Sequence, residues 1–163
     1  MLKKSQTEMS VLVTPEMANF NGNMHGGELL KLLDRVAYTC ATRYCGRYAV
    51  TLSVDQVTFK QSIKIGELLT FYASVNYTGR SSMEIGVKVI AENLQEQSTR
   101  HTNTCYFTMV SVDENSKPCP VPKFKPESEK ELERFQLAEQ RRERRMLQNK
   151  VDAMIKSKST PSN

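Results

Sequence analysis

Residues 22–34, Gly-Asn-Met-His-Gly-Gly-Glu-Leu-Leu-Lys-Leu-Leu-Asp, decide how this 163-residue chain folds. Glycines and polar side chains dominate the stretch as far as Gly27. Beyond that residue, apolar side chains recur at the three- and four-residue spacing of an α-helix. The pattern predicts a helix over residues 27–44 that is buried on most sides and is closed by Gly46. An acid, Asp34, lies inside this apolar helix.

On both sides of the helix the apolar period is two, which is typical of strands. The slip in this alternation near Asp55 and Gln56 predicts a β-bulge or a change of buried face. The simplest arrangement is α+β, an antiparallel sheet that wraps around one long central helix. One such layer leaves a sheet edge uncovered, so pairing with a second copy is expected. The expected strands cover residues 9–13, 48–59, 68–77, 82–93 and 100–112.

Three prolines, Pro118, Pro120 and Pro122, interrupt any regular element and predict that the domain covers residues 1–122. Residues 123–163 are expected to form a charged tail, helical over 127–155 and disordered over 157–163. The formal net charge of +5 lies mostly in this tail. The domain carries 12 lysines and arginines against 11 acids, and the tail carries 11 against 7.

Charge and composition exclude several classes of protein. The domain lacks the dense basic surface that phosphate-backbone binding requires, so no nucleic-acid partner is expected. The basic run of residues 141–145 leaves RNA binding by the tail open, although an exposed helix with Glu/Arg pairs is favoured. Neither a membrane-spanning run nor a signal peptide is evident, so a cytoplasmic protein without a membrane partner is expected. Two histidines and four cysteines without a CxxC pair predict no metal site and reduced cysteines.

The candidate site begins in the polar loop before the helix. Asn23, His25, Gly26 and Gly27 converge at a helix start, where unpaired N–H groups and the helix dipole favour negative charge. Such a place can hold a carbonyl oxygen that becomes an oxyanion. Asp34 is then either a general base or nucleophile at an interface, or a helix acid that faces solvent beside Arg35. His25 is equally a residue that caps the helix or packs against it.

Other catalytic signatures are missing from the sequence. It contains neither GxSxG nor a phosphate-binding GxxxxGK[ST]. The remaining conspicuous stretch, residues 79–84 (Gly-Arg-Ser-Ser-Met-Glu), begins a strand. It is either an ordinary turn with a solvated arginine or a donor cluster that grips a phosphate or a pantetheine chain.

The sequence resembles a known family over residues 8–145. Residues 22–34 closely resemble the signature of hotdog acyl-CoA thioesterases, in the group of the bacterial acyl-CoA thioester hydrolases and the mammalian brain acyl-CoA hydrolase. Residues 53–59 (Ser-Val-Asp-Gln-Val-Thr-Phe) are similar to the next strand of that family, and residues 79–85 to its later turn and strand. Residues 120–122 and the charged helix after them resemble the end of the domain in that group.

The resemblance implies a hotdog fold and a homo-oligomer, a double-hotdog dimer that often assembles into a hexamer. It implies cleavage of fatty acyl-CoA to free acid and CoA, with no metal and no cofactor. The catalytic residues would be Asp34 as base or nucleophile and Asn23 from the adjacent subunit. His25, Gly26 and Gly27 would form the oxyanion and substrate-positioning group. The expected CoA contacts are Thr58, Phe59, Lys60, Arg80, Ser81 and Ser82.

Two other functions stay open from the sequence. A hotdog dehydratase or hydratase usually has a catalytic histidine before the helix, and His25 lies near that place. A non-catalytic acyl-CoA-binding module would bind the thioester without consuming it, although pure binding does not need an acid in an apolar helix.

Overall fold

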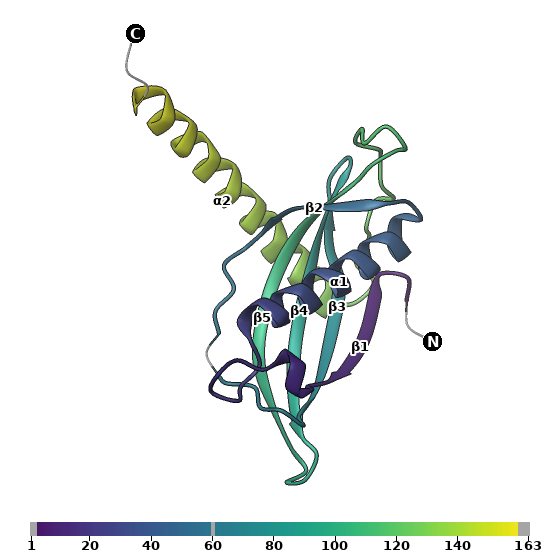
Figure 1. The fold of residues 1–163 in the computed structure, drawn as a ribbon. Helices are drawn as coiled ribbons and strands as arrows, with labels where there is room; N and C mark the ends of the chain where they lie inside the picture. The colour runs from purple at the N-terminus through teal and green to yellow at the C-terminus, as the bar shows by residue number, and fades with distance from the viewer. Residues whose placement is uncertain (1–2, 60, 160–163) are drawn as a thin grey trace. The chain divides into compact units, whose positions relative to one another are not determined.

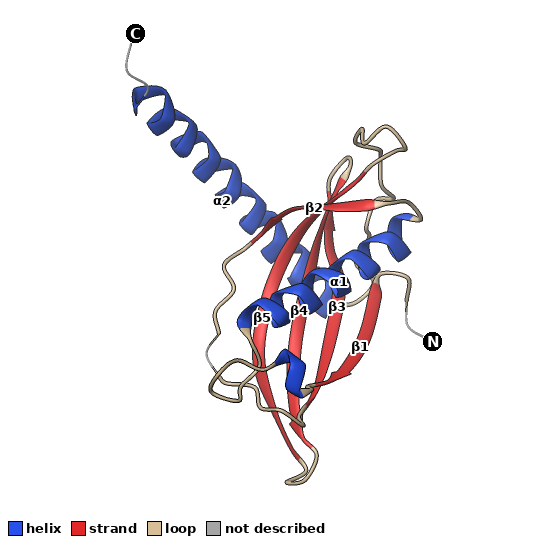
Figure 2. Cartoon of the chain, in the orientation of Figure 1, coloured by secondary structure: helices blue, strands red, loops and turns tan. Residues whose placement is uncertain are grey.

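The structure is a computed structural model that describes residues 3–59 and 61–159. The chain divides into two compact units, Met1–Phe124 and Lys125–Asn163. The first unit contains five strands, a short 3-10 helix and one long helix, and the second contains a single helix (Figure 2). The elements are β1 (Gln6–Leu12), η1 (Pro15–Met17), α1 (Gly26–Cys45), β2 (Ala49–Val54), β3 (Leu68–Thr78), β4 (Ser82–Asn93), β5 (Ser98–Ser111) and α2 (Glu129–Ser159).

The five strands form one antiparallel sheet in the order β1-β3-β4-β5-β2. Helix α1 lies across one face of this sheet and contacts all five strands (Figure 1). This is the predicted α+β arrangement, a sheet around one central helix. Strand β2 is an edge strand that pairs with β5 alone among the described residues, so its other edge is open.

The core is built from the sheet face that meets α1. Val75 pairs with Ile85, which pairs in turn with Phe107, and all three side chains are buried. Alternate residues along each strand continue this face, because successive side chains of a strand point to opposite sides. From α1 the buried contributors recur at helical spacing: Leu29, Leu32, Leu33, Val36, Ala37, Cys40 and Ala41.

Both ends of α1 have the expected caps. The His25 side chain accepts a hydrogen bond from the Gly27 backbone N–H at the first turn. At the other end Gly46 adopts the left-handed conformation, with φ of 67°, and its N–H donates to the Thr42 carbonyl. Only glycine adopts that conformation without a steric penalty from Cβ, so the predicted stop at Gly46 is confirmed.

The predicted strand over residues 48–59 is wrong in its second half. Strand β2 ends at Val54, and the register irregularity lies between Thr51 and Ser53 instead of at residues 55 and 56. After Val54 the Asp55 N–H donates to the Tyr106 carbonyl at 2.9 Å. The chain then leaves the sheet, so the apolar residues Val57 and Phe59 do not extend the core face.

The predicted tail helix is confirmed, but its end lies further along the chain. Helix α2 continues to Ser159, four residues beyond the predicted helix end at residue 155, and the predicted disorder at the end of the chain stays a prediction. The first helix breaker beyond residue 155 is Pro161, which explains why the helix does not stop earlier. Residues 160–163 lie outside the described part of the chain.

All four cysteines are free thiols, and Cys40 and Cys105 are buried in the core. Burial raises the pKa of Cys40 to about 11 and that of Cys105 to about 12, because the thiolate would lose its hydration. Both therefore pack as small apolar side chains.

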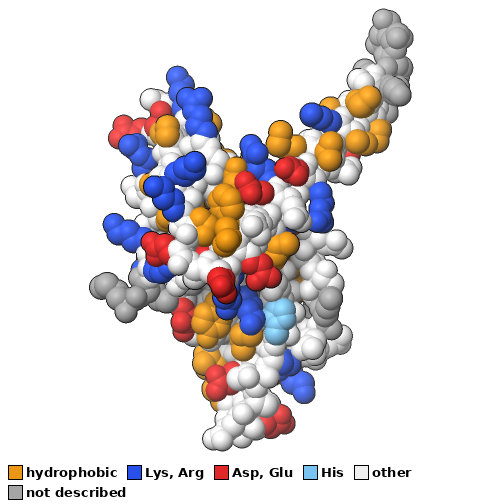
Figure 3. All heavy atoms as spheres, turned by 180° about the vertical axis from the view of Figure 1, so that it is seen from behind, with side chains coloured by type: hydrophobic (Ala, Val, Ile, Leu, Met, Phe, Trp, Pro, Cys, Tyr) orange, Lys and Arg blue, Asp and Glu red, His pale blue; other side chains and the backbone are white. Residues whose placement is uncertain are grey.

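On the side of the molecule opposite to the view of Figure 1, acidic and basic side chains are intermixed (Figure 3). Within residues 3–59 and 61–159, no helix is long and apolar enough to cross a membrane.

Candidate active site

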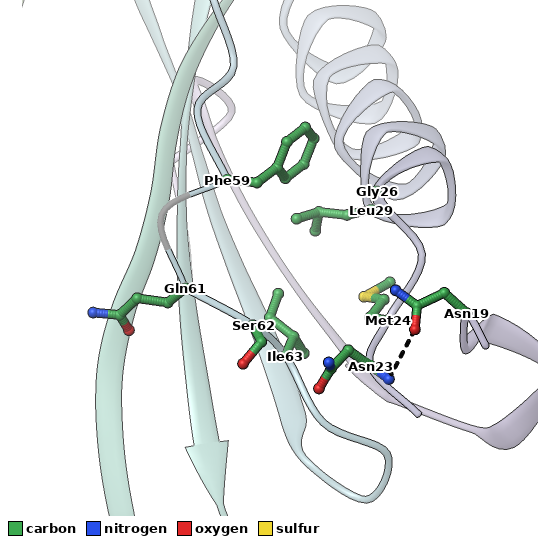
Figure 4. A pocket seen from close by; sticks show the side chains of 9 residues that line it. All are labelled: Asn19, Asn23, Met24, Gly26, Leu29, Phe59, Gln61, Ser62 and Ile63. Atoms are coloured by element: carbon green, nitrogen blue, oxygen red, sulfur yellow. Dashed lines mark hydrogen bonds between the residues drawn. The ribbon is translucent and has the colours of Figure 1, made fainter. Parts of the chain in front are cut away.

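A pocket of about 260 Å³ lies beside the start of α1 (Figure 4). One wall is the loop that precedes the helix, and the opposite wall is the segment between β2 and β3. The floor is apolar, because Met24, Leu29 and Ile63 are all buried, and the rim is mostly polar. The lining residues are Asn19, Asn23, Met24, Gly26, Leu29, Phe59, Gln61, Ser62 and Ile63.

The loop of residues 19–25 is held by hydrogen bonds at both of its ends. The Asn19 N–H donates to the Asn23 carbonyl at 2.7 Å, and Asn19 Oδ1 accepts from the backbone N–H groups of Asn21 at 2.9 Å and Asn23 at 3.2 Å. The Met24 N–H donates to the Ile63 carbonyl at 2.7 Å, which joins the two walls of the pocket. Among the described residues, the Asn19 side-chain NH2 has no partner, so it is available as a donor.

The first turn of α1 offers fewer free donors than its sequence suggests. The Gly27 N–H donates to His25 Nδ1 at 3.1 Å, and the N–H groups of Glu28 and Leu29 both donate to the His25 carbonyl. Within the described part of the chain, only the Gly26 N–H of this turn has no acceptor. Because Nδ1 accepts this hydrogen bond, the bond requires the tautomer of His25 that carries its N–H on Nε2. Gly26 N–H and His25 Nε2–H are therefore the donors at this helix start that have no acceptor among the described residues.

Asp34 lies further along the helix and is exposed in the single chain. Its Oδ1 accepts a hydrogen bond of 2.6 Å from the Thr51 hydroxyl of β2. This bond fixes the direction of the carboxylate and leaves Oδ2 unengaged among the described residues. The carboxylate is thus oriented by the fold, yet it remains open on the side of α1 that faces away from the core.

The predicted site residues fall into three groups. Asn23, Gly26 and Phe59 meet at the pocket, with His25 and Gly27 in the cap beside it and Thr58 next to Phe59. Asp34 follows Gly26 by eight residues, which is about 12 Å along a helix. Arg80, Ser81 and Ser82 lie beyond the far end of β3, an 11-residue strand that spans about 35 Å. Lys60 lies outside the described residues.

Two residues of this region were not singled out by the sequence. Asn19 lines the pocket, and Thr51 holds Asp34. Nothing in the sequence distinguishes Asn19 from Asn21 and Asn23, because all three lie in the same polar loop. The role of Thr51 depends on the packing of β2 beside α1, which the sequence pattern does not give. Among residues 3–59 and 61–159, no three His, Cys, Asp or Glu side chains are placed to hold a metal ion.

An antiparallel sheet around one long helix is the hotdog arrangement that the sequence resemblance implies, and the comparisons with known proteins identify the class within it. The sequence model of the thioesterase superfamily matches residues 21–97. Protein VdlD of Helicobacter pylori is 58% identical over 137 residues, which cover 84% of this chain and 78% of VdlD.

Solved structures give a narrower class. A hexameric acyl-CoA thioesterase, solved in its apo form, is 36% identical and superimposes with a TM-score of 0.86, covering 90% of this chain and 94% of that one. An acyl-CoA hydrolase from Staphylococcus aureus, solved with butyryl-CoA and CoA, is 31% identical with a TM-score of 0.86 and 96% of both chains covered. This chain therefore belongs to the acyl-CoA thioester hydrolases of the thioesterase superfamily.

The Staphylococcus aureus enzyme has also been solved as three single alanine variants. The substituted residues are an aspartate, an asparagine 15 positions before it and a threonine 17 positions after it. In the present chain, Asn19, Asp34 and Thr51 have the same residue types at the same separations.

Proposed function

We propose that this protein hydrolyses fatty acyl-CoA to free fatty acid and CoA, with Asp34 as the catalytic carboxylate and an asparagine from the adjacent subunit. The observation that carries the proposal is the hydrogen bond of 2.6 Å from Thr51 to Asp34. A surface aspartate without a task has no need of a fixed direction, whereas a general base or nucleophile does.

Two chemical routes are open to this carboxylate. As a base, Asp34 takes a proton from a water molecule whose oxygen attacks the thioester carbonyl carbon. As a nucleophile, it attacks that carbon itself, and water then hydrolyses the resulting anhydride. On both routes the carbonyl oxygen becomes negative, the C–S bond breaks, and CoA leaves as a thiolate that takes up a proton.

The helix start supplies the groups that stabilise the oxyanion. The unengaged N–H of Gly26 and the Nε2–H of His25 both lie where the helix dipole favours negative charge. Loss of one such donor costs about 3–4 kcal/mol in well-studied hydrolases. The same role was predicted for Gly27, and it would require the bond from its N–H to His25 to open. The predicted role of Gly27 stays a prediction.

The distance between the pocket and Asp34 supports a site made from two subunits. An attacking group must lie within about 3–3.5 Å of the carbon it attacks. Asp34 lies about 12 Å along the helix from Gly26 of its own chain. The pocket of one subunit would therefore receive the carboxylate of another, as the pairing of asparagine and aspartate across an interface requires.

Two asparagines compete for the amide role. Asn23 was predicted from the sequence, and it lines the pocket with a side chain that has no partner among the described residues. Asn19 matches the spacing of the three positions replaced in the Staphylococcus aureus enzyme. Its Oδ1 is anchored by two backbone N–H groups, which aims its NH2 as a donor. We favour Asn19 for the contact with the thioester carbonyl or the attacking water.

Exposed apolar side chains support association on the Asp34 side of the molecule. Phe20, beside Asn19 in the pocket loop, has no buried surface in the single chain, and Leu52 of β2 is 69% exposed. Leu30, Tyr38, Tyr48, Val50 and Val54 are also exposed around the outer face of α1 and the open edge of β2. Pairing of two β2 edges would cover this surface and give the double-hotdog dimer. Assembly of such dimers into a hexamer follows the hexameric structure that this chain resembles.

The CoA moiety would then span two subunits. Thr58 and Phe59 follow β2 on one side of the pocket, and the predicted contact of Lys60 with CoA stays a prediction, because that residue lies outside the described part of the chain. Arg80, Ser81 and Ser82 lie at the opposite end of the sheet of their own chain. An antiparallel pairing of two sheets brings the opposite ends of two subunits together. The arginine and the two serines would therefore contact CoA bound at the partner's pocket.

The test is hydrolysis of a panel of acyl-CoAs from acetyl to stearoyl, with the released thiol detected. The wild-type protein is expected to turn over part of this series. Asp34→Asn, which keeps the shape of the side chain, is expected to lower kcat by about 10²–10⁴-fold. Arg35→Ala, an exposed neighbour on the same helix, is the matched control and should keep its activity. An Asp34→Asn enzyme with the activity of Arg35→Ala would refute the proposal.

A further inference from the structure

One wall of the pocket has almost no backbone support of its own. This wall segment consists of residues 58–59 and 61–63, between β2 and β3. Among residues 56–59, 61 and 62, no backbone group is hydrogen-bonded to another backbone group. The segment nevertheless supplies four of the pocket-lining residues, Phe59, Gln61, Ser62 and Ile63.

Two side chains of β5 hold the wall segment in place of backbone hydrogen bonds to a neighbouring strand. Asn103, which is buried, donates from Nδ2 to the Thr58 carbonyl at 2.6 Å. Arg100 donates from Nη2 to the Ser62 carbonyl at 2.8 Å. Both acceptors are main-chain carbonyls of the wall segment, at its two ends, so the two bonds hold the segment against the sheet.

Arg100 is itself held by a buried acid. Glu67 accepts from Arg100 at both carboxylate oxygens, at 2.5 and 2.7 Å, and its Oε2 also accepts from the Lys64 N–H at 2.8 Å. A bidentate pair of this kind fixes the plane of the guanidinium. The hydrogen bond from Arg100 also lowers the pKa of Glu67, so this pair stays charged at neutral pH.

Phe59 is the residue whose place depends most on these bonds. It directly follows Thr58, and its ring lies on the start of α1, where a Cβ atom added to Gly26 would be 3.6 Å from Phe59 Cζ. The outer end of the ring lies against the helix start, and about half of the side chain remains exposed and accessible to a ligand. Phe59 lines the pocket (Figure 4), and because it directly follows Thr58, a shift of the Thr58 carbonyl would displace its ring.

We infer that Asn103 and Arg100 are positioning residues. They hold the wall segment in the shape that binds the acyl-CoA substrate, but they do not contact the substrate themselves. The inference rests on the proposed function, because it assigns the pocket to that substrate. Loss of either bond would weaken substrate binding more than the chemical step, since the reacting groups belong to other parts of the chain.

The matched control is Thr102, the neighbour of Asn103 in β5. It is equally buried, at 4% exposure, and it also makes one side chain–backbone hydrogen bond, to the Val89 carbonyl of β4. Asn103→Ala, which removes one hydrogen bond, is expected to raise KM for acyl-CoA about tenfold with kcat within about threefold. Arg100→Lys keeps the charge beside Glu67 but loses the fork that also reaches the Ser62 carbonyl, so it should raise KM at least as much with kcat again within about threefold. Thr102→Val should lower the melting temperature but leave KM within about twofold of the wild type.

A second readout does not depend on catalysis. The sequence contains no tryptophan, so Phe59→Trp places a single tryptophan at the wall, which can be excited selectively over the six tyrosines. Adding Asn103→Ala or Arg100→Lys should lower the fluorescence anisotropy of this tryptophan and raise its quenching by acrylamide, and adding Thr102→Val should change neither. The inference would be overturned if KM and tryptophan fluorescence were unchanged in both the Asn103→Ala and the Arg100→Lys variants. Equal changes in the Thr102→Val variant would overturn it as well. If the wild-type protein hydrolysed no acyl-CoA, only the proposed function would be refuted. The fluorescence measurements would then still show whether Asn103 and Arg100 hold the wall segment in place.

Discussion

The two faces of α1 obey different rules. On the inner face, Leu33 and Ala37 have no exposed surface, and the five strands of the same chain cover them. On the outer face, Leu30, Asp34 and Tyr38 follow one another at four-residue spacing and all are exposed. The inner face is complete within one chain, whereas the outer face combines an oriented carboxylate with uncovered apolar side chains. Packing of the inner face therefore stabilises the single chain. We assign the proposed catalysis to the outer face, after a second subunit has covered it.

The largest loss of activity is expected from a substitution that prevents a second subunit from covering the exposed apolar surface. Leu52→Lys places a charge on the open edge of β2, where Leu52 is 69% exposed in the single chain. A lysine on an edge strand opposes pairing, so the variant should be a folded monomer that has lost nearly all hydrolysis. Sedimentation and circular dichroism check size and fold. Leu94→Lys, in the turn between β4 and β5, is the control that should keep both assembly and activity. A fully active Leu52→Lys monomer would show that a single chain forms a complete active site.

A smaller but more specific effect separates the two asparagines of the pocket loop. Asn19→Ala removes the anchored NH2 and is expected to lower kcat about 10²–10³-fold, as loss of a donor to an oxyanion does. Asn23→Ala, in the same loop, should cost tenfold or less. Steady-state kinetics of the two variants under the same conditions give the comparison. The reverse order of effects would return the amide role to Asn23, and equal small effects would remove it from the loop.

The smallest effect is expected at the hydroxyl that orients the carboxylate. Thr51→Val keeps the shape of the side chain and removes the hydrogen bond to Asp34. Such a bond to a charged group contributes about 1.5–3 kcal/mol, so kcat should fall about 10–100-fold, while the melting temperature stays close to that of the wild type. Thr51→Ser, which keeps the hydroxyl, should recover most of the activity. Wild-type kcat in Thr51→Val would mean that Asp34 needs no orientation.

Much of the fold could be predicted because the inner face follows simple periods. The helical spacing of the apolar residues gave α1 nearly to its ends, and the two-residue alternation gave β3 and β4 within a residue. The prediction failed after Val54, where apolar residues continue although the strand does not. Phe59 is apolar because it covers the helix start and the pocket, and a periodic pattern does not distinguish that purpose from burial in the core.

The candidate site was predictable only in part, for a physical reason. Asp34 stands out in the sequence because an acid within an apolar helix is unusual. Thr51 is an ordinary strand residue until β2 packs beside α1, and Asn103 is an ordinary buried amide until the wall segment meets β5. These roles depend on contacts between segments far apart in the chain, which local patterns do not contain. The separation of Arg80 from Phe59 follows from the length of β3, and it too needs the fold.

The most direct test mixes two inactive chains. Asn19→Ala and Asp34→Ala subunits, each purified as an inactive protein, are unfolded together at equal amounts, refolded and assayed on a long-chain acyl-CoA. Random pairing makes half of the dimers mixed, and each mixed dimer holds one site with both residues intact, so about a quarter of the wild-type activity should return. Activity no greater than that of the two variants refolded separately, with mixed dimers present, would show that the asparagine and the aspartate of a site do not come from different subunits.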